Sequence, residues 1–432
     1  MKFILSNFGT RGEIEPCAAI GRELLNRGHE VCMAVTSDLV GFVESVGLPA
    51  FAYQVDSRSL IRFHLELWEK FYFTRNHFKI RDLRKVRAES MQVYLQADAE
   101  TRTALMSLAN GADLLLTGWC YEQPAATVAE CHGIPFATIH YSPVRANGAI
   151  LPALPAPVVR SAKAVTEWLR WRQGKKAEDA QRFELGLPKT HAPYMTRMAE
   201  RGSLEIQAYD QICYPGLAAE WAKWGLQRPF VGSLTMELPT NTDDEALSWI
   251  AEGAPPICFS FGSMPVKSSA DTIAMISAAC ARLGERALII SGEAGLSGIP
   301  YPDHLKVVPA ASYAAVFPRC RAVVHHGSTG ATGASLRAGV PVLILWFIGD
   351  QAVLGESVKR LKVGTARRFS ATTLESLVAD LRTILAPQYV IRAREIAPRI
   401  IEPAEGVAAA ADLVESLAER CAADPAGRSS KP

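Results

Sequence analysis

The sequence contains no long apolar run. A membrane-spanning helix needs about 18 or more consecutive apolar residues, and no stretch of the chain supplies them. The opening MKFILSNFGTRGE holds only a brief apolar run before charged and turn residues, too short for the core of a secretory signal. We therefore expect a cytoplasmic protein, whose closest approach to lipid is peripheral contact with the inner face of the membrane.

The chain also has little excess charge and no clustered cysteines. Its formal net charge is +2, so no general attraction to nucleic acid is expected. The nine cysteines form neither a C-x-x-C pair nor a regular spacing, which indicates reduced core residues rather than a zinc site or a disulfide framework. No strand-like segment is followed by G-x-G-x-x-G, so a dinucleotide-dependent oxidoreductase is not indicated.

The length and the hydrophobic pattern favour two domains. A chain of 432 residues exceeds what one hydrophobic core normally organises. In both halves, short apolar runs alternate with helical segments, which is the pattern of doubly wound parallel sheets. A polar, turn-rich stretch at 215–254 fits a linker between them. We predict an α/β protein with one domain at 1–228 and a second at 229–432.

The most informative segment is HHGSTGATG at 325–333. It follows an apolar run that predicts a buried strand, and it precedes small residues at helical spacing. The N–H groups in the first turn of such a helix point out of the sheet and form an anion site. The candidate phosphate ligands are the imidazole of His325 or His326, the hydroxyls of Ser328 and Thr329, and the backbone at Gly330. These groups together indicate a phosphate or diphosphate site.

A second apolar run, Pro341–Trp346, leads into Gly349, Asp350 and Gln351. Ligands of open α/β sheets bind at the carboxyl ends of the strands. A carboxylate beside a carboxamide offers hydrogen-bond acceptors and donors on neighbouring positions, which suits the alternating hydroxyls of a hexose. We therefore predict that Asp350 and Gln351 bind a sugar.

The stretch HHGSTGATGASLRAGVPVLILWFIGDQ resembles the donor-binding signature of the inverting nucleotide-sugar glycosyltransferases with the GT-B fold. The opening MKFILSNFGTRGEIEP is similar to that of the sterol, glycopeptide-antibiotic and mycobacterial glycopeptidolipid glycosyltransferases. The likeness runs in motif order from Met1 to about Glu415, although 53–205 matches only in general character. It implies two Rossmann-like domains facing across a cleft, with the acceptor in the first and the donor in the second. It also implies a terminal helix that packs back on the first domain. The last residues, AADPAGRSSKP, have the composition of a disordered tail.

The resemblance also implies particular donor contacts. His326 aligns with the histidine that approaches the diphosphate, and Ser263 resembles a serine near the donor phosphates, although a plain turn serine explains it as well. Val308 precedes the region of the base-binding loop, where the absence of a tryptophan leaves uracil or thymine to backbone contacts. Three positions depart from the family's GGAGT pattern and imply redistributed phosphate contacts, namely Ser328, Thr329 and Ala331.

The loop Phe8–Pro16 follows the first predicted strand and holds the candidate catalytic base. An inverting transfer needs a group that removes the acceptor hydroxyl proton while the nucleoside diphosphate leaves from the opposite face. Glu13 stands where related antibiotic glycosyltransferases usually carry aspartate, so we predict it as the base. The alternative is an acid that only stabilises a helix N-terminus.

Three further residues are predicted on the acceptor side, each with a structural alternative. Thr10 can hydrogen-bond either substrate, Arg11 can approach an anionic group, and His140 ends a strand expected to reach the acceptor. Thr10 and Arg11 can equally stabilise their loop, and His140 can be a buried structural histidine. The basic, aromatic segment Ser57–Arg87 fits an acceptor pocket, an anionic membrane surface or a helical core. A lipophilic acceptor agrees with the first two interpretations.

No D-x-D motif is present, and Asp243–Asp244 falls in the expected linker, where solvated charge is the ordinary explanation. A helix N-terminus and His326 can stabilise a departing diphosphate, so neither a metal nor a cofactor is predicted. We predict transfer of a hexose or 6-deoxyhexose from a UDP- or dTDP-sugar to a hydroxyl of a hydrophobic acceptor: a glycopeptidolipid, a glycolipid or another natural product. The alternatives are a nucleotide-sugar epimerase of related fold and a catalytically silent binding protein.

Overall fold

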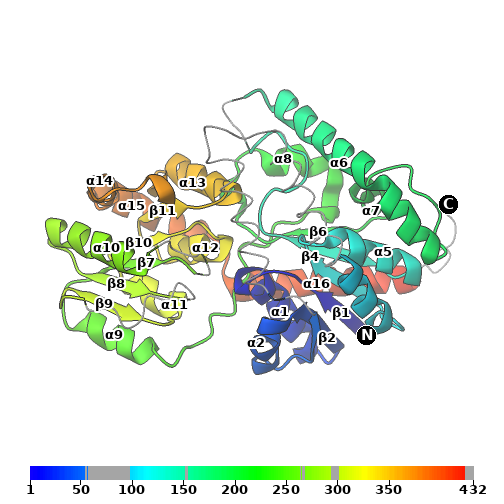
Figure 1. Cartoon of the computed structure of the whole chain (residues 1–432), viewed down its shortest axis with the longest axis horizontal. Coiled ribbons are helices and arrows are strands. Elements are labelled where there is room, and N and C mark those ends of the chain that lie inside the picture. Colours follow the sequence, from blue (N-terminus) through cyan, green and yellow to red (C-terminus); the bar gives the residue numbers. More distant parts are fainter. Residues whose placement is uncertain are drawn as a thin grey trace. The chain divides into compact units, whose positions relative to one another are not determined.

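The computed structural model describes residues 1–53, 56, 98–150, 154–262, 264, 268–292 and 301–423 (Figure 1). The chain divides into two compact units, each built on a six-stranded parallel sheet. The first comprises Met1–Tyr209, Pro215–Leu234 and Pro403–Pro432, and the second comprises Asp210–Tyr214 and Thr235–Glu402. The predicted boundary at 228/229 lies shortly before the change of unit at Leu234, and the stretch from Pro403 belongs to the first unit.

The first sheet has the strand order β3-β2-β1-β4-β5-β6. Its strands are β1 (Lys2–Ser6), β2 (Glu30–Thr36), β3 (Ala50–Tyr53), β4 (Leu114–Gly118), β5 (Phe136–His140) and β6 (Leu204–Gln207). Ile4 of β1 lies opposite Cys32 on one side and Leu115 on the other. Strands buried on both faces are continuously apolar, which is why short runs such as LLLTG form this sheet. Strands β1 to β3 form one half of the sheet and β4 to β6 form the other. The crossover point of the sheet therefore lies between the neighbouring strands β1 and β4.

Helices of the first unit pack around this sheet. They are α1 (Arg11–Asn26), η1 (Ser37–Leu39), α2 (Val40–Ser45), α5 (Glu122–His132), α6 (Ala156–Glu184), α7 (Tyr194–Glu200), α8 (Leu217–Trp221), η3 (Ala222–Gln227) and α16 (Pro403–Ala423). Helix α16 packs on α1, and His29 Nε2 lies 2.5 Å from Glu415 Oε1. A Cβ at Gly406 would lie 2.3 Å from the carbonyl oxygen of Val231, so glycine permits this close approach.

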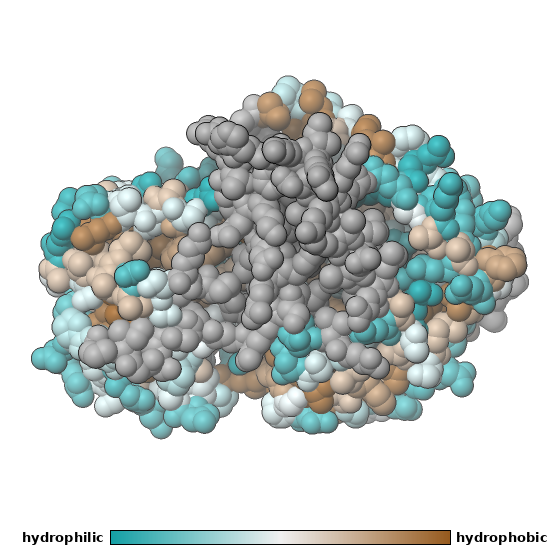
Figure 2. All heavy atoms as spheres, viewed as in Figure 1, coloured by the Kyte–Doolittle hydropathy of each residue, from teal (hydrophilic) through white to brown (hydrophobic). Residues whose placement is uncertain are grey.

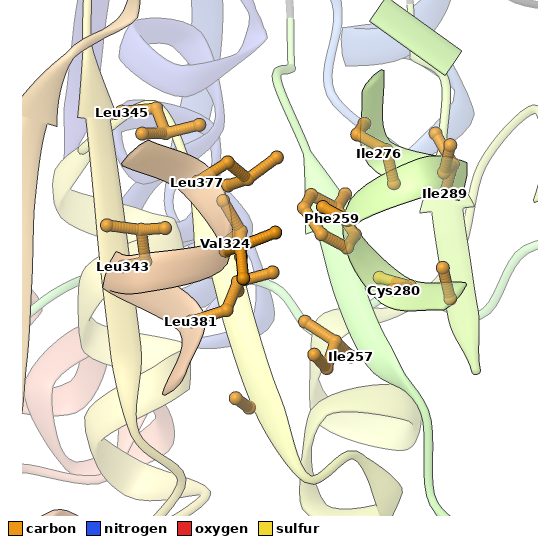
Figure 3. Close-up of a cluster of buried hydrophobic side chains, with 14 of the residues drawn as sticks. Ile257, Phe259, Ile276, Cys280, Ile289, Val324, Leu343, Leu345, Leu377 and Leu381 are labelled. Atoms are coloured by element: carbon orange, nitrogen blue, oxygen red, sulfur yellow. The ribbon is translucent and has the colours of Figure 1, made fainter. Parts of the chain in front are cut away.

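The second sheet repeats the arrangement in the order β12-β11-β10-β7-β8-β9. Its strands are β7 (Ile257–Ser260), β8 (Ala287–Ile290), β9 (Leu305–Val308), β10 (Ala322–His325), β11 (Val342–Trp346) and β12 (Gly364–Arg368). Successive strand residues face opposite sides of the sheet. Phe259 and Val324 therefore join the core with Ile276 and Leu381 (Figure 3), while Cys258 belongs to a separate apolar cluster.

The helices of the second unit connect these strands. They are η2 (Gln211–Cys213), α9 (Asp243–Ala251), α10 (Ser269–Leu283), α11 (Tyr313–Val316), η4 (Phe317–Arg319), α12 (Thr329–Arg337), α13 (Gly349–Leu361), η5 (Phe369–Ala371), α14 (Leu374–Ile384), α15 (Pro387–Ile396) and η6 (Ala397–Arg399). Helices α10 and α14 pack against each other over the core of Figure 3. The predicted pair of doubly wound parallel sheets is confirmed. Within the described ranges, no helix is both long and apolar enough to cross a bilayer.

Candidate functional site

The crossover of the second sheet lies between β7 and β10, and ligands of doubly wound sheets bind at such a crossover. Gly262 follows β7, and His326 follows β10. Gly262 has a φ of +58°, and a Cβ there would lie 2.9 Å from Cε1 of His326. Glycine therefore allows the β7 loop to lie against the imidazole ring, and the predicted phosphate-binding histidine stands at the crossover.

Two more glycines with positive φ extend this surface. Gly292 follows β8 with a φ of +53°, and a Cβ there would lie 2.6 Å from the carbonyl oxygen of Gly262. Gly327 follows β10 with a φ of +96°, and its Cβ would lie 2.9 Å from Cγ2 of Ile344. Three adjacent strands are thus each followed, after one intervening residue, by a glycine with positive φ. Gly262 and Gly292 were not among the predicted site residues, although each is a glycine placed just after an apolar run.

The two histidines at the end of β10 have different environments. Burial, together with the neighbouring His326, lowers the pKa of His325 from 6.5 to about 3. Burial lowers the pKa of His326 to about 4, although a hydrogen bond to the Ser260 backbone opposes the shift. Nδ1 of His325 accepts the N–H of Gly327 at 2.9 Å. Nε2 of His325 and Nδ1 of His326 are both buried, and neither has a hydrogen-bond partner among the described residues. His326 is therefore a neutral imidazole with an unused polar atom at the crossover.

Helix α12 begins next to His326 in the chain. Ser328 is its N-cap, and the serine hydroxyl accepts the N–H of Ala331 at 3.4 Å. Ser328, Thr329 and Gly330 are half-buried. The predicted phosphate ligands thus form the first turn of a nine-residue helix at the carboxyl end of β10. A helix N-terminus in this position attracts an anion.

Asp350 and Gln351 occupy the first turn of α13, at the carboxyl end of β11. Asp350 is exposed, whereas Gln351 is buried. The carboxamide oxygen of Gln351 accepts the N–H groups of Phe347 at 2.8 Å and Ile348 at 3.3 Å. These bonds orient the side chain by capping its own helix, and the carboxylate of Asp350 is the exposed acceptor of the pair. Their binding of a sugar stays a prediction.

For two of the predicted donor-binding residues, Val308 and Ser263, no described side chain is available to the donor. The side chain of Val308 is fully buried, and its carbonyl oxygen accepts the N–H of Ser291 at 2.9 Å. A base contact at this position therefore falls to the loop that follows Val308, not to its side chain. Ser263 lies outside the described residues. Both donor roles stay predictions.

Asp243, predicted as a solvated charge in the linker, is buried and hydrogen-bonded in the structure. Its carboxylate accepts the N–H of Ser312 at 2.8 Å, the N–H of Thr240 at 2.8 Å and the hydroxyl of Thr240 at 2.7 Å. Desolvation opposes these bonds, but together they lower the pKa of Asp243. The expectation of solvated charge was wrong for Asp243. The residue is buried at the start of α9 and holds the loop after β9 in place.

The predicted catalytic loop lies at the crossover of the first sheet. Thr10 is the N-cap of α1, and Oε2 of Glu13 accepts its N–H at 2.7 Å and its hydroxyl at 2.5 Å. Gly9 has a φ of +135°, and a Cβ there would lie 2.8 Å from Oε2 of Glu13. Glu13 therefore caps the N-terminus of α1, as expected if its role is only structural. A carboxylate has about four acceptor sites, so these bonds are compatible with the catalytic role, which stays a prediction.

The backbone of Glu13 is held as well. Its carbonyl oxygen accepts Nδ2 of Asn7 at 2.6 Å and the hydroxyl of Tyr141 at 2.7 Å. A Cβ at Gly118 would lie 2.2 Å from Oδ1 of Asn7, so the ends of β1 and β4 meet through a glycine. Asn7 and Tyr141 were not among the predicted site residues. The available signal was a polar residue directly after a strand.

Arg11 is exposed at the start of α1. Its Nε lies 3.0 Å from Oε2 of Glu15, and its guanidinium carbon lies 4.8 Å from the centre of the Phe42 ring. These contacts stabilise the loop, which is the structural alternative for Arg11. The acceptor-binding roles of Thr10 and Arg11 stay predictions.

His140 is fully buried in a polar network at the end of β5. Its Nε2 lies 3.1 Å from Oγ1 of Thr138 and 3.8 Å from Oε1 of Glu122, and its Nδ1 lies 3.4 Å from Nε2 of Gln207. Against desolvation, Arg145 and His140 lower the pKa of Glu122 to about 2. This is the environment of a structural histidine. Contact between His140 and an acceptor stays a prediction.

Acid is expected to destabilise the second unit through its two buried histidines. Below pH 6.5 the unfolded chain takes up protons at both positions, whereas the folded rings stay neutral until about pH 4 and pH 3. Folding stability is therefore lost as the pH falls from 6.5 toward 4, by roughly 2 kcal/mol per histidine at pH 5. Urea unfolding at pH 7 and pH 5 measures this loss. His326→Gln should reduce the loss by about half, and an equal loss in the variant contradicts the assignment.

Comparison with known proteins identifies the class. Residues 264–415 match the family model of the erythromycin biosynthesis protein CIII-like C-terminal domain. A protein of Mycobacterium tuberculosis, described as an uncharacterized glycosyltransferase, is 58% identical over 97% of this chain and 100% of its own. The chain belongs to this glycosyltransferase family.

More distant relatives agree with this assignment. A sterol 3-beta-glucosyltransferase of Arabidopsis thaliana is 26% identical over 95% of this chain and 67% of the plant protein. The solved structure of the glycosyltransferase VinC in complex with dTDP is similar with a TM-score of 0.66 at 18% identity, over 97% of this chain and 100% of that chain. The predicted GT-B fold class is confirmed, and so is the resemblance to sterol and natural-product glycosyltransferases.

Proposed function

We propose that the protein is an inverting glycosyltransferase that moves a hexose or 6-deoxyhexose from a UDP- or dTDP-sugar to a hydroxyl of a hydrophobic acceptor. The observation that carries this proposal is the crossover of the second sheet. There a neutral, buried His326 lies against Gly262, and helix α12 begins next to it in the chain. The first turn of a helix is suited to a diphosphate. Nδ1 of His326, which has no partner among the described residues, can donate to that diphosphate once the anion has raised the pKa of the ring and the ring is protonated.

The proposed reaction is a single displacement at the anomeric carbon. Glu13 takes the proton of the acceptor hydroxyl as its oxygen forms a bond to that carbon. The bond from the anomeric carbon to the diphosphate oxygen breaks on the opposite face, and the configuration inverts. Negative charge develops on the departing diphosphate, where His326 and the first turn of α12 stabilise it. Asp350 and Gln351 hold the sugar hydroxyls.

The similar VinC structure contains dTDP, which supports a nucleotide-sugar donor. The sterol 3-beta-glucosyltransferase relative supports a hydrophobic acceptor. The aromatic, basic segment Ser57–Arg87, on which the lipophilic acceptor and membrane contact were predicted, lies outside the described residues. We keep a glycopeptidolipid, a glycolipid or another natural product as the acceptor class.

A thermal-shift screen tests the donor site. UDP, dTDP or their sugar conjugates are expected to raise the melting temperature, with equal effect in the presence and absence of magnesium. At 100 times its Kd, a ligand that binds only the folded state stabilises it by about 2.7 kcal/mol. Among the described residues, no group of three or more His, Cys, Asp or Glu is arranged to hold a metal ion. GDP and NAD serve as controls, and a response to NAD alone contradicts the proposed donor site.

A further inference from the structure

Helix α6 of the first unit exposes an apolar stripe. Val158 is 57% exposed, Val165 55%, Leu169 46% and Trp168 48%. Val158, Ala162, Val165 and Leu169 follow one another at spacings of four, three and four residues, which places them on one face of a helix. Exposed apolar residues that form a continuous patch usually mark an interaction surface.

The opposite face of α6 fixes this orientation. Val159, Glu178 and Arg182 are buried. Arg182 lies 2.7 Å from Oε2 of Glu130, and Glu178 lies 2.8 Å from Arg197. These buried ion pairs attach α6 to the first unit by its polar face and turn the apolar stripe outward. Figure 2 shows brown side chains along the edge where α6 runs in Figure 1.

Positive charge continues the stripe. Arg172 and Lys176 come three and seven residues after Leu169, so they lie on the same face of the helix, and both are exposed. The guanidinium carbon of Arg172 lies 5.5 Å from the centre of the Trp168 ring. Residues 156–177 contain one acidic residue, Glu167, and six basic ones, namely Arg160, Lys163, Arg170, Arg172, Lys175 and Lys176.

We propose that this face of α6 binds an anionic phospholipid surface. The face is defined by Val158, Ala162, Val165, Leu169, Arg172 and Lys176, with Trp168 at its margin. A helix that lies in the plane of a membrane inserts an apolar face, places tryptophan at the interface and directs cations to anionic headgroups. A second copy of the chain fits less well, because pairing two such faces sets cations against cations or against the apolar stripe.

Vesicle flotation of the full chain tests this proposal. The vesicles are phosphatidylcholine alone and phosphatidylcholine with an equal part of phosphatidylglycerol. Binding is expected to the anionic vesicles, and added salt should weaken it. Val165→Glu/Leu169→Glu should weaken binding by at least about tenfold. Arg172→Gln/Lys176→Gln should weaken it by roughly 25-fold, since each cation near an anionic surface contributes about a fivefold change.

The control variant is Ile391→Glu. Ile391 is 58% exposed and lies on α15 of the second unit, so the change places the same acid at an equally exposed apolar position. It should leave vesicle binding unchanged. All the substituted side chains are exposed, and unchanged melting temperatures would show that the variants fold.

Three results overturn the proposal: no binding to anionic vesicles, equal binding to neutral vesicles, or loss of binding in Ile391→Glu. Self-association that Val165→Glu/Leu169→Glu abolishes, without vesicle binding, assigns the face to a second copy instead. The assay contains neither donor nor acceptor, so its outcome is independent of the proposed transferase reaction.

Discussion

Glu13→Gln is expected to lower kcat for glycosyl transfer by about 10² to 10⁴-fold, the usual contribution of a general base. Binding of UDP or dTDP should be unchanged, because the donor ligands are predicted on the second unit. The fold should tolerate the change, since glutamine can replace glutamate in a capping box. The measurements are the initial rate at saturating substrates and the calorimetric Kd of the nucleotide.

The matched control for this variant is Glu15→Gln. Glu15 is half-buried, lies two residues further along α1 and pairs with the exposed Arg11. Its substitution removes the same charge from the same turn of the helix and should leave kcat within about twofold, because an exposed ion pair contributes little. A fully active Glu13→Gln enzyme contradicts the assignment of Glu13 as base. A wild-type protein that binds nucleotide without any turnover is instead the silent binding protein.

Gly292→Ala is expected to weaken nucleotide binding by at least about tenfold and to destabilise the protein by roughly 1–3 kcal/mol. The new Cβ would lie 2.6 Å from the carbonyl oxygen of Gly262, which is backbone and cannot rotate away. Gly262 must therefore shift, and it lies against the ring of His326. Calorimetry with UDP and dTDP measures the loss of binding, and urea unfolding measures the destabilisation.

Gly284→Ala separates this contact from backbone strain. Gly284 ends α10 with a φ of +67°, close to the +53° of Gly292, and a Cβ there would meet nothing within 4 Å. The Gly284→Ala substitution should destabilise the protein by about 1 kcal/mol and leave nucleotide binding unchanged. Equal nucleotide binding by the two variants would show that the Gly262 contact does not support the donor site.

The strands could be predicted because a buried parallel strand needs a short, continuous apolar run. The short apolar run KFILS near the start of the chain forms β1, and the run ICFS forms β7. The predicted terminal helix extends over Pro403–Ala423. In each of these segments the local sequence pattern favours the secondary structure that the folded protein adopts, so contacts with distant residues do not change the element that forms.

Polar residues were less predictable, because their roles depend on partners far away in the sequence. The polar stretch around Asp243 predicts a solvated charge. In the structure Asp243 is buried, and its carboxylate accepts the N–H of Ser312, which is 69 residues away in the sequence. His140 lies within reach of Glu122 and Gln207, which no local pattern connects. The outward face of α6 was likewise not recognised, because its orientation depends on buried ion pairs with Glu130 and Arg197.

The sequence by itself determined the two doubly wound sheets, the glycosyltransferase family and the helix that begins beside His326, because apolar runs and small residues act through local geometry. Only the tertiary structure decided which backbones meet at each crossover. There, Gly118 allows the end of β4 to approach Asn7, and Gly262 and Gly292 allow the loops after β7 and β8 to approach His326. The physical reason is steric. A glycine after a strand is ordinary in sequence, and its importance appears when the space that a Cβ would occupy is filled by a neighbouring strand.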